Sequence, residues 1–446
     1  MKMALIAMSG VRAHNPELTA LGLTLPGFVE RNHIVASLPS LGLLTLAAMT
    51  PAALDLSYVE VPNLKDLSGV PGEFDVVAIS SFTAQIKDAY TLADRYRALG
   101  TAVILGGLHV TVMPEEALRH ADSVVLGEGE VLWPEVISDL LDSPSALCPV
   151  YDARGRSFDL GHAPMPRYEL LDPQNYNRLA VQTQRGCPYC CEFCAASLLI
   201  SPAYKLKPVE RVIAEIRHIK SIWPRPFIEF ADDNTFVNKA HSKRLVKQLA
   251  KENVRWFTET DLSVADDEEL LELMRDSGCA QLLIGLESPS FCSLDGLEQR
   301  ANWKARQLDR YAESIGRIQR HGITVNGCFI LGLDGSSSES FDEILKFVCE
   351  SGLYEVQITV QTAFPGTPLY KRLKQEDRIL HDDAWELCTL FDVNFQPKHM
   401  TVSELETGLR QLGTKLYSED LTRERRARFR RLRRGASRGV HQSEAR

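Results

Sequence analysis

The chain has 446 residues, more than one hydrophobic core usually serves, so its length favours two domains with an appendage. Its formal net charge is -9, whereas proteins whose main partner is nucleic acid carry an excess of Lys and Arg. We therefore expect no nucleic-acid partner. The first residues lack a basic leader and a cleavage site, and no apolar run is long enough to cross a bilayer, so we expect neither a signal peptide nor a transmembrane segment.

Residues 1–150 alternate short apolar strands with amphipathic helices. Because such alternation with short connections is typical of a parallel, doubly wound sheet, we expect a Rossmann-like α/β domain whose ligand lies at the carboxyl ends of the strands. The predicted strands are 2–8, 54–59, 74–80, 101–105 and 123–126, and the predicted helices are 41–49, 86–99 and 130–141.

A second alternating series follows a linker that we place at 151–177, which is rich in Pro, Asp, Gly and Arg. Six consecutive strand-helix units predict a partial (β/α)6 barrel over 178–370. Beyond it, 371–446 reads as a mainly helical region whose Arg-rich end, 423–438, is expected to be an exposed helix. The predicted strands are 179–184, 227–231, 255–260, 281–286, 324–331 and 355–363, and the predicted helices are 208–222, 239–251, 267–276, 303–321 and 338–351.

Four of the ten cysteines lie between Cys187 and Cys194, too close together to pair easily in disulfides. This spacing favours a metal and a reducing, cytoplasmic location. Cys187, Cys191 and Cys194 form a C-x3-C-x2-C motif in which each thiolate can bind one iron of a cubane and leave the fourth iron open. Cys190 then remains a non-ligand. The alternative is a structural zinc on two C-x2-C pairs, which the adjacency of Cys190 and Cys191 disfavours.

The cysteine motif, with its aromatic Phe193, resembles that of the radical S-adenosylmethionine (SAM) superfamily. The resemblance implies a [4Fe-4S] cluster on the three cysteines and a 5'-deoxyadenosyl radical made from SAM. It also implies SAM contacts at several strand ends, although the Asp-Asp-Asn turn is equally suited to cap a helix. The implied SAM-binding residues are Phe193, Asp232, Asp233 and Asn234, with Glu287 at the ribose and Gly332 beside the adenine.

The first domain has no G-x-G-x-x-G after its first strand, which lowers the case for NAD. Its strand ends instead resemble the cobalamin-binding domains that precede many radical SAM cores. The D-x-H-x-x-G motif is absent, so we expect no histidine-cobalt bond from it, and His109 is expected to contact the nucleotide loop. A vestigial domain without cobalamin is the alternative. The implied cobalamin-binding residues are Leu41, Gly42, Ser80, Ser81, Thr83, Gly106, Gly107, His109, Gly127, Glu128, Gly129 and Glu130.

Over residues 1–370 the chain looks closest to the hopanoid C-2 methylase type. That resemblance implies methylation of an unactivated carbon through methylcobalamin, with a small-molecule or lipid-like substrate and an external electron donor such as flavodoxin or ferredoxin. A cobalamin-linked cyclase, oxidase or aminocarboxypropyl transferase remains open, as does a non-catalytic, zinc-containing binding protein. No catalytic side chain beyond the cofactor sites is predicted.

Overall fold

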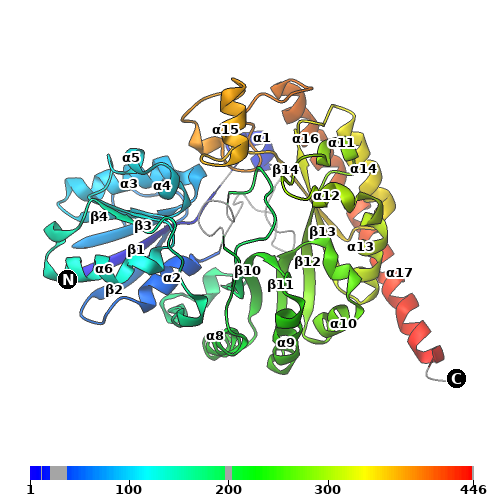
Figure 1. The fold of residues 1–446 in the computed structure, drawn as a ribbon, viewed down its shortest axis with the longest axis horizontal. Coiled ribbons are helices and arrows are strands. Elements are labelled where there is room, and N and C mark those ends of the chain that lie inside the picture. Colours follow the sequence, from blue (N-terminus) through cyan, green and yellow to red (C-terminus); the bar gives the residue numbers. More distant parts are fainter. Residues whose placement is uncertain (12, 21–37, 196–202, 444–446) are drawn as a thin grey trace.

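The first sheet of the molecule is six-stranded and entirely parallel (Figure 1). The computed structural model describes residues 1–11, 13–20, 38–195 and 203–443. The strand order is β2-β1-β3-β4-β5-β6, so the order reverses between β1 and β3, where ligands bind in doubly wound folds. The strands are β1 (Lys2–Met8), β2 (Asp55–Val61), β3 (Val76–Ser81), β4 (Ala102–Gly106), β5 (Ser123–Leu126) and β6 (Val150–Asp152).

Helices cover both faces of this sheet and bury two apolar clusters against it. Ser40 begins α2 as its N-cap, because its side chain accepts a hydrogen bond from the Leu43 amide. The three predicted helices are present within two residues, while two short helices that carry the chain around the end of β4 were not predicted. The helices are α2 (Leu41–Ala48), α3 (Ile86–Ala98), α4 (Leu108–Val112), α5 (Pro114–Ala117) and α6 (Gly129–Asp142).

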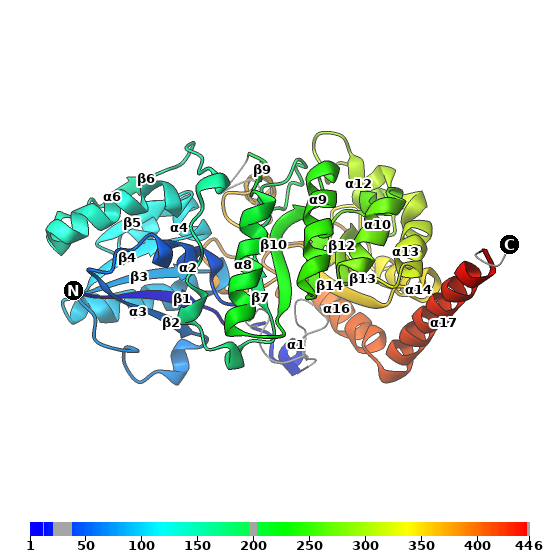
Figure 2. The same ribbon diagram turned by 90° about the horizontal axis from the view of Figure 1, so that it is seen from below.

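The second sheet is also six-stranded and parallel, in the order β14-β13-β12-β11-β10-β7. Since β7 and β14 are its outer strands, the sheet is an open arc, and its helices cover the outside of the curve (Figures 1 and 2). The predicted partial barrel is confirmed. Its elements are β7 (Leu179–Val181), α8 (Val209–Ile222), β10 (Phe227–Thr235), α9 (Lys239–Leu249), β11 (Arg255–Thr260), α10 (Glu268–Asp276), β12 (Cys279–Glu287), α13 (Tyr311–Arg320), β13 (Thr324–Leu331), α14 (Ser340–Ser351) and β14 (Glu355–Val360).

Two local departures from the predicted barrel matter for the site. The strand predicted over 179–184 ends at Val181, and β8 (Gln184–Arg185) pairs instead with β9 (Lys205–Leu206) as an antiparallel hairpin. The helix predicted over 303–321 is broken, so that α12 (Trp303–Arg306) is separate from α13. The hairpin of β8 and β9 joins the two ends of the cysteine segment. The break in the helix places Lys304 in the separate short helix α12.

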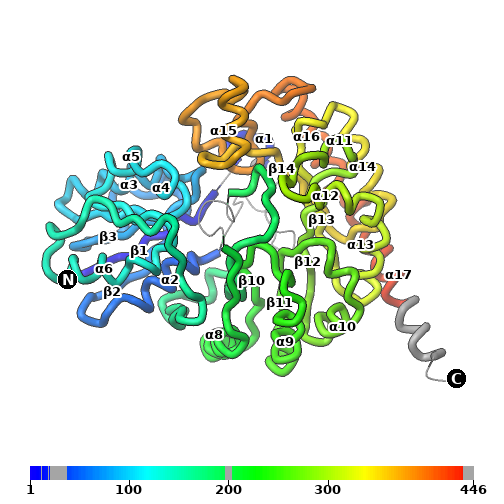
Figure 3. Tube along the Cα trace, viewed as in Figure 1, coloured from blue at the N-terminus to red at the C-terminus, as the bar shows by residue number. Residues whose placement is uncertain are grey.

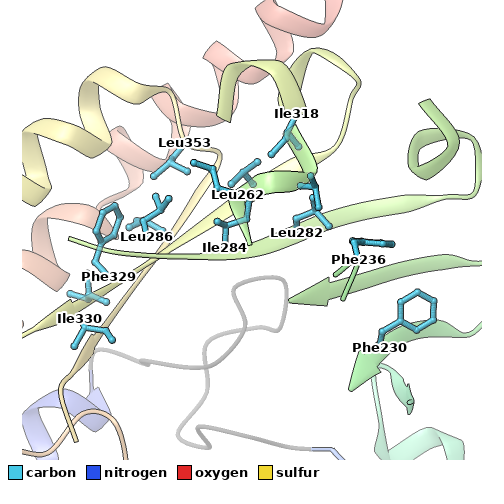
Figure 4. Packing of buried hydrophobic residues seen from close by; sticks show 14 of the residues in the cluster. Phe230, Phe236, Leu262, Leu282, Ile284, Leu286, Ile318, Phe329, Ile330 and Leu353 are labelled. Carbon is cyan, nitrogen blue, oxygen red and sulfur yellow. The ribbon is translucent and has the colours of Figure 1, made fainter. Parts of the chain in front are cut away.

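The barrel helices pack on the sheet through a continuous apolar core, part of which is drawn in Figure 4. Phe230 and Phe236 pack against Trp256, and Leu282, Ile284 and Leu286 form a row along β12. The core fills the space between strands and helices, so the concave side of the arc remains for polar side chains.

The C-terminal region contains α15 (Pro368–Gln375), α16 (Val402–Leu416) and α17 (Glu419–Ser443), with irregular chain and one short 3-10 helix, η10 (Trp385–Leu387), over 376–401. The mainly helical prediction holds outside that stretch. Trp385 and Cys388 join the apolar cluster of the first domain, so this region contacts both domains. In Figure 3, β1 begins at one end of the molecule and α17 lies at the other. The remaining short helices include α1 (Pro16–Ala20) and α11 (Phe291–Leu294).

Candidate functional site

One cavity lies between the first domain and the barrel and has a volume of about 530 Å³. Its walls come from the carboxyl ends of β1, β3, β4 and β5, from α2, and from barrel residues that include Gln182, Arg185 and Asp233. Apolar side chains such as Ile104, Val125 and Trp133 also line it. A planar, largely apolar ligand with polar edges matches this combination.

Two glycines at the strand ends of this cavity have backbone conformations that other residues rarely adopt. Gly107 has φ 109° and Gly127 has φ 82°, a left-handed conformation that favours glycine. A Cβ at Gly107 would lie 3.2 Å from the Ser80 hydroxyl, and one at Gly127 would lie 3.1 Å from the Ala153 carbonyl carbon. Backbone conformation and close packing against neighbouring residues therefore both favour glycine at these two positions.

Most of the predicted cobalamin-binding residues line this cavity, and two do not. Thr83 is buried in the 3-10 helix η2 (Thr83–Gln85), outside the lining. His109 is fully buried on the other side of α4, where its Nε2 lies 3.4 Å from Glu116 Oε1 and its ring meets that of Trp385 edge to face. The expected contact of His109 with a nucleotide loop is therefore not supported. The lining residues are Leu41, Gly42, Ser80, Ser81, Gly106, Gly107, Gly127, Glu128, Gly129 and Glu130.

The second cavity, of about 450 Å³, lies inside the barrel arc. Cys187, Cys191 and Cys194 all line it, and Cys190 does not. Burial raises the pKa of Cys187 to about 11 and that of Cys191 to about 12. The Asn234 amide nitrogen lies 3.8 Å from the Cys187 sulfur, close enough for a hydrogen bond to it.

The cysteines are not arranged around a single ion. Within the described ranges, no three His, Cys, Asp or Glu side chains converge closely enough to hold one metal ion. A structural zinc needs four converging donors, whereas a cubane cluster takes each thiolate on a different iron. Three thiols that line one cavity are the number that a cubane with one open iron takes from a protein.

Four of the residues predicted to contact SAM line this second cavity, namely Phe193, Asp233, Asn234 and Glu287. Asp232 does not, because its carboxylate is turned into the protein. There it accepts hydrogen bonds from the Thr183 and Gln184 amides at 2.7 and 3.0 Å and from two threonine hydroxyls. Gly332 also lies outside the lining, since a Cβ there would meet Leu405 at 2.8 Å and Phe395 at 3.3 Å. Both residues have structural roles.

Glu287 is held in a strained position at the end of β12. Its φ is 63°, and the register between β12 and β13 shifts at this residue. Lys304 donates a hydrogen bond of 2.6 Å to its Oε1 and one of 3.0 Å to the Gly285 carbonyl. A Cβ at Gly285 would lie 2.5 Å from Glu287 Oε1 and 3.2 Å from Lys304 Nζ, so a larger residue would displace this ion pair.

Sequence reasoning did not single out several polar residues of the barrel cavity. Burial, with the neighbouring Glu229, raises the pKa of Glu259 to about 7. The Oε1 atoms of Gln357 and Gln361 are buried and accept no hydrogen bond within the described part of the chain. Glu259 lies on the inner face of β11, Gln357 lies on that of β14, and Gln361 follows the end of β14. The alternation of side chains along these strands could have indicated them. They offer acceptors to a ligand.

The two cavities meet at Asp233, which lines both. The Gly186 amide donates a hydrogen bond of 2.7 Å to its Oδ2, which ties the residue before Cys187 to the end of β10. Burial raises the pKa of the Asp233 carboxyl. Asp233 is therefore a wall that the two cavities share.

Three protein-family models match successive parts of the chain. Residues 31–137 match the B12 binding domain, residues 181–348 match the radical SAM superfamily, and residues 367–444 match a domain of unknown function, DUF4070. The chain therefore contains a B12 binding domain followed by a radical SAM domain. Such a protein is an enzyme that uses a [4Fe-4S] cluster, SAM and cobalamin.

Among curated relatives, the bacteriochlorophyllide d C-12(1)-methyltransferase of Chlorobaculum tepidum is 29% identical over 384 residues, which cover 82% of this chain and 81% of that protein. The hopanoid C-2 methylase of Rhodopseudomonas palustris is 28% identical, over 79% of this chain and 67% of that protein. The anaerobic magnesium-protoporphyrin IX monomethyl ester cyclase of Cereibacter sphaeroides is 23% identical, over 75% and 58%.

Among solved structures, the fold is similar to that of the radical SAM methyltransferase TsrM of Kitasatospora setae, solved with cobalamin and a [4Fe-4S] cluster bound. The TM-score is 0.63 at 14% identity, with 98% of this chain and 99% of that chain covered. The likeness extends over both domains and the C-terminal region.

Proposed function

We propose that the protein methylates an unactivated carbon of a small or lipid-like molecule, with SAM as the source of the radical and methylcobalamin as the methyl donor. The observation that carries this proposal is the meeting of the two cavities at Asp233. A carbon that loses hydrogen on one side of this junction lies next to a methyl donor held on the other. The distance over which a substrate must move between the two steps is then small.

When bound, the cluster and SAM supply a radical that removes hydrogen from carbon, and cobalamin supplies a transferable methyl group. Cys187, Cys191 and Cys194 would hold the cluster. Asp233, Asn234 and Glu287 would accept hydrogen bonds from the amino and hydroxyl groups of SAM, and Lys304 would keep the Glu287 carboxylate in place. The apolar walls of the first cavity would exclude water from the transferred group.

For cobalamin, the strand-end residues Ser80, Ser81, Gly106 and Gly107 would lie against the ligand edge. Leu41 and Trp133 would contact its apolar face. Since His109 lies outside this cavity, we propose that no histidine-cobalt bond forms at that position. The buried acceptors of Gln357 and Gln361 would receive N–H or O–H donors of SAM or the substrate.

The experiment is a reconstituted, anaerobic assay with hydroxocobalamin, a reductant and SAM carrying a trideuterated methyl group. The named compounds of the relatives, a hopanoid and a bacteriochlorophyllide, are the first substrates to test. We expect 5'-deoxyadenosine and S-adenosylhomocysteine to form together, with a product heavier by one trideuteromethyl group. Formation of 5'-deoxyadenosine and an altered product without any S-adenosylhomocysteine contradicts methyl transfer.

That second outcome would favour a ring-closing reaction, since cyclases with the same two cofactor domains are among the relatives. An oxidised product or one carrying an aminocarboxypropyl group is distinguished by the same mass measurement. The electron donor is proposed to be a flavodoxin or a ferredoxin, and the oxygen-sensitive cluster favours a reducing, cytoplasmic setting. No helix in the described ranges has the length and apolar character needed to span a bilayer.

A further inference from the structure

The segment that carries the cysteines is closed at both ends by one hairpin. Arg185 and Lys205 are cross-strand partners in β8 and β9, and the chain between them contains the whole C-x3-C-x2-C motif. Whatever holds these two cations therefore fixes both ends of the cysteine segment at once. Both of them reach out of the barrel, to the same carboxylate in the first domain.

That carboxylate is Glu128, which is 3% exposed and lines the cavity of the first domain. Arg185 donates a hydrogen bond of 2.9 Å to its Oε1, and Lys205 donates one of 2.7 Å to its Oε2. The Phe158 amide lies 2.6 Å from Oε2, and Arg185 also pairs with Glu130 at 2.7 Å. Burial alone would raise the pKa of Glu128, but the hydrogen bonds from Lys205, Phe158 and Arg185 lower it, so the carboxylate stays charged.

From this contact the path to the cluster site is short. Arg185 is followed by Gly186, whose amide is bound to Asp233, and then by Cys187, whose sulfur lies near Asn234. Glu128 and Asp233 both line the first cavity, and Asp233 also lines the second. Arg185 also lines the first cavity, so a ligand that displaces water from this cavity lowers the dielectric constant beside the Arg185–Glu128 pair and strengthens the ion pairs of Glu128 with the cysteine hairpin.

We propose that Lys205, together with Arg185 and Glu128, couples the two cofactor sites, so that cobalamin in the first cavity and the cluster on the cysteines stabilise each other's binding. Lys205 is a positioning residue, because it lines neither cavity. This inference rests on the proposed function for its two cofactors. Because coupling between sites is reciprocal, it is measurable from either side.

The test measures the affinity of the full-length protein for hydroxocobalamin by its visible spectrum, with the cluster reconstituted and in the cluster-free apoprotein. For the wild-type chain we expect roughly tenfold tighter binding in the cluster-loaded form, in the range typical of coupled sites. In Lys205→Met the two affinities should become equal within about twofold, and Lys205→Arg should restore most of the difference. Circular dichroism checks that each variant is folded.

Lys87→Met is the matched control. Lys87 forms an ion pair of 2.9 Å with Glu386, and this pair also joins the first domain to the C-terminal region. Both side chains of the pair are exposed, and neither belongs to the cysteine hairpin. This variant should keep the wild-type ratio of affinities. Retention of that ratio in Lys205→Met, or a ratio of one in the wild type, overturns the coupling. If the wild type binds no cobalamin in either form, the proposed function fails as well.

Discussion

Burial of the cysteines makes their thiols poor acids before a metal arrives. The pKa of Cys187 lies near 11 and that of Cys191 near 12, so both carry protons at neutral pH, whereas iron binds the thiolate. Cluster assembly must therefore release protons and should become more favourable as pH rises. Exposure does not distinguish ligand from non-ligand here, because Cys190 is also half-buried.

Replacing any one of Cys187, Cys191 and Cys194 with alanine should abolish both the iron-sulfur absorbance and the cleavage of SAM. Each of these thiols is proposed to hold a different iron, so none can substitute for another. Cys190→Ala is the control in the same segment and should retain iron and activity. Iron content and 5'-deoxyadenosine yield measure the effect. Loss of the cluster in Cys190→Ala with retention in one of the other three would reverse the assignment.

Asp232 provides a pH-dependent prediction for stability. Burial raises its pKa from the usual 3.8 to about 6, against four hydrogen bonds that lower it. The folded state therefore favours the protonated form, so this contribution to stability is present below pH 4 and is lost as pH rises through 6. From 1.36 kcal/mol per pKa unit, Asp232→Asn should reduce the decline in the free energy of unfolding between pH 4 and 6.5 by about 2 kcal/mol.

Urea unfolding at several pH values measures this difference. The wild-type profile should decline more steeply over this pH range than that of Asp232→Asn. Parallel profiles of the two proteins would contradict a raised pKa at the buried carboxyl.

At this scale the sequence predicted residues that lie in short motifs at strand ends, such as Gly107, Glu287 and the cysteines. It did not predict Lys304 as the partner of Glu287 or Lys205 as the partner of Glu128, because the members of these pairs are 17 and 77 positions apart in the chain. Contacts of that kind depend on the fold. Asp232 is the opposite case. Its motif is visible in the sequence, but the direction of its side chain, which is turned into the protein, is not.

Among the elements, α16 depends on a glycine for its place against the barrel. A Cβ at Gly408 would lie 2.2 Å from the ring of Phe341 on α14, so Gly408→Ala forces these helices apart. We expect a loss of about 1–3 kcal/mol in the free energy of unfolding, as for other overpacked contacts.

Gly316→Ala is the matched control, since it also lies inside a helix, α13, and its Cβ would meet only an arginine side chain at 3.5 Å. Better helix propensity should raise the stability of that variant by up to about 1 kcal/mol. Equal effects of the two substitutions, measured by urea unfolding, would contradict the packing of α16 on α14.

The prediction of strands succeeded where the apolar pattern extends over several residues. This is the case for β11 and β13, whose observed bounds match the predicted ones. The prediction missed the hairpin of β8 and β9, because each strand has only two residues and no period is visible. The irregular stretch over 376–401 was also missed. There the chain follows the surface of the first domain through Trp385, and the surface it contacts is not visible in local sequence.

At the scale of the molecule, the first domain is held from two sides. Glu128 and Glu130 meet the cysteine hairpin on one side, and Trp385 donates a hydrogen bond of 3.2 Å to Glu116 on the other. The order of the domains could be read from the sequence, but their docking could not. That docking is what brings the two cavities together at Asp233.

The central claim is that cobalamin and the cluster occupy neighbouring cavities of one chain, and electron paramagnetic resonance of the reduced holoprotein tests it most directly. In the form that contains cob(II)alamin and a reduced cluster, both signals should be broadened or split by their mutual magnetic interaction. The broadening should disappear in Cys191→Ala, which lacks the cluster. Two unbroadened signals from a protein that holds both cofactors would contradict the account.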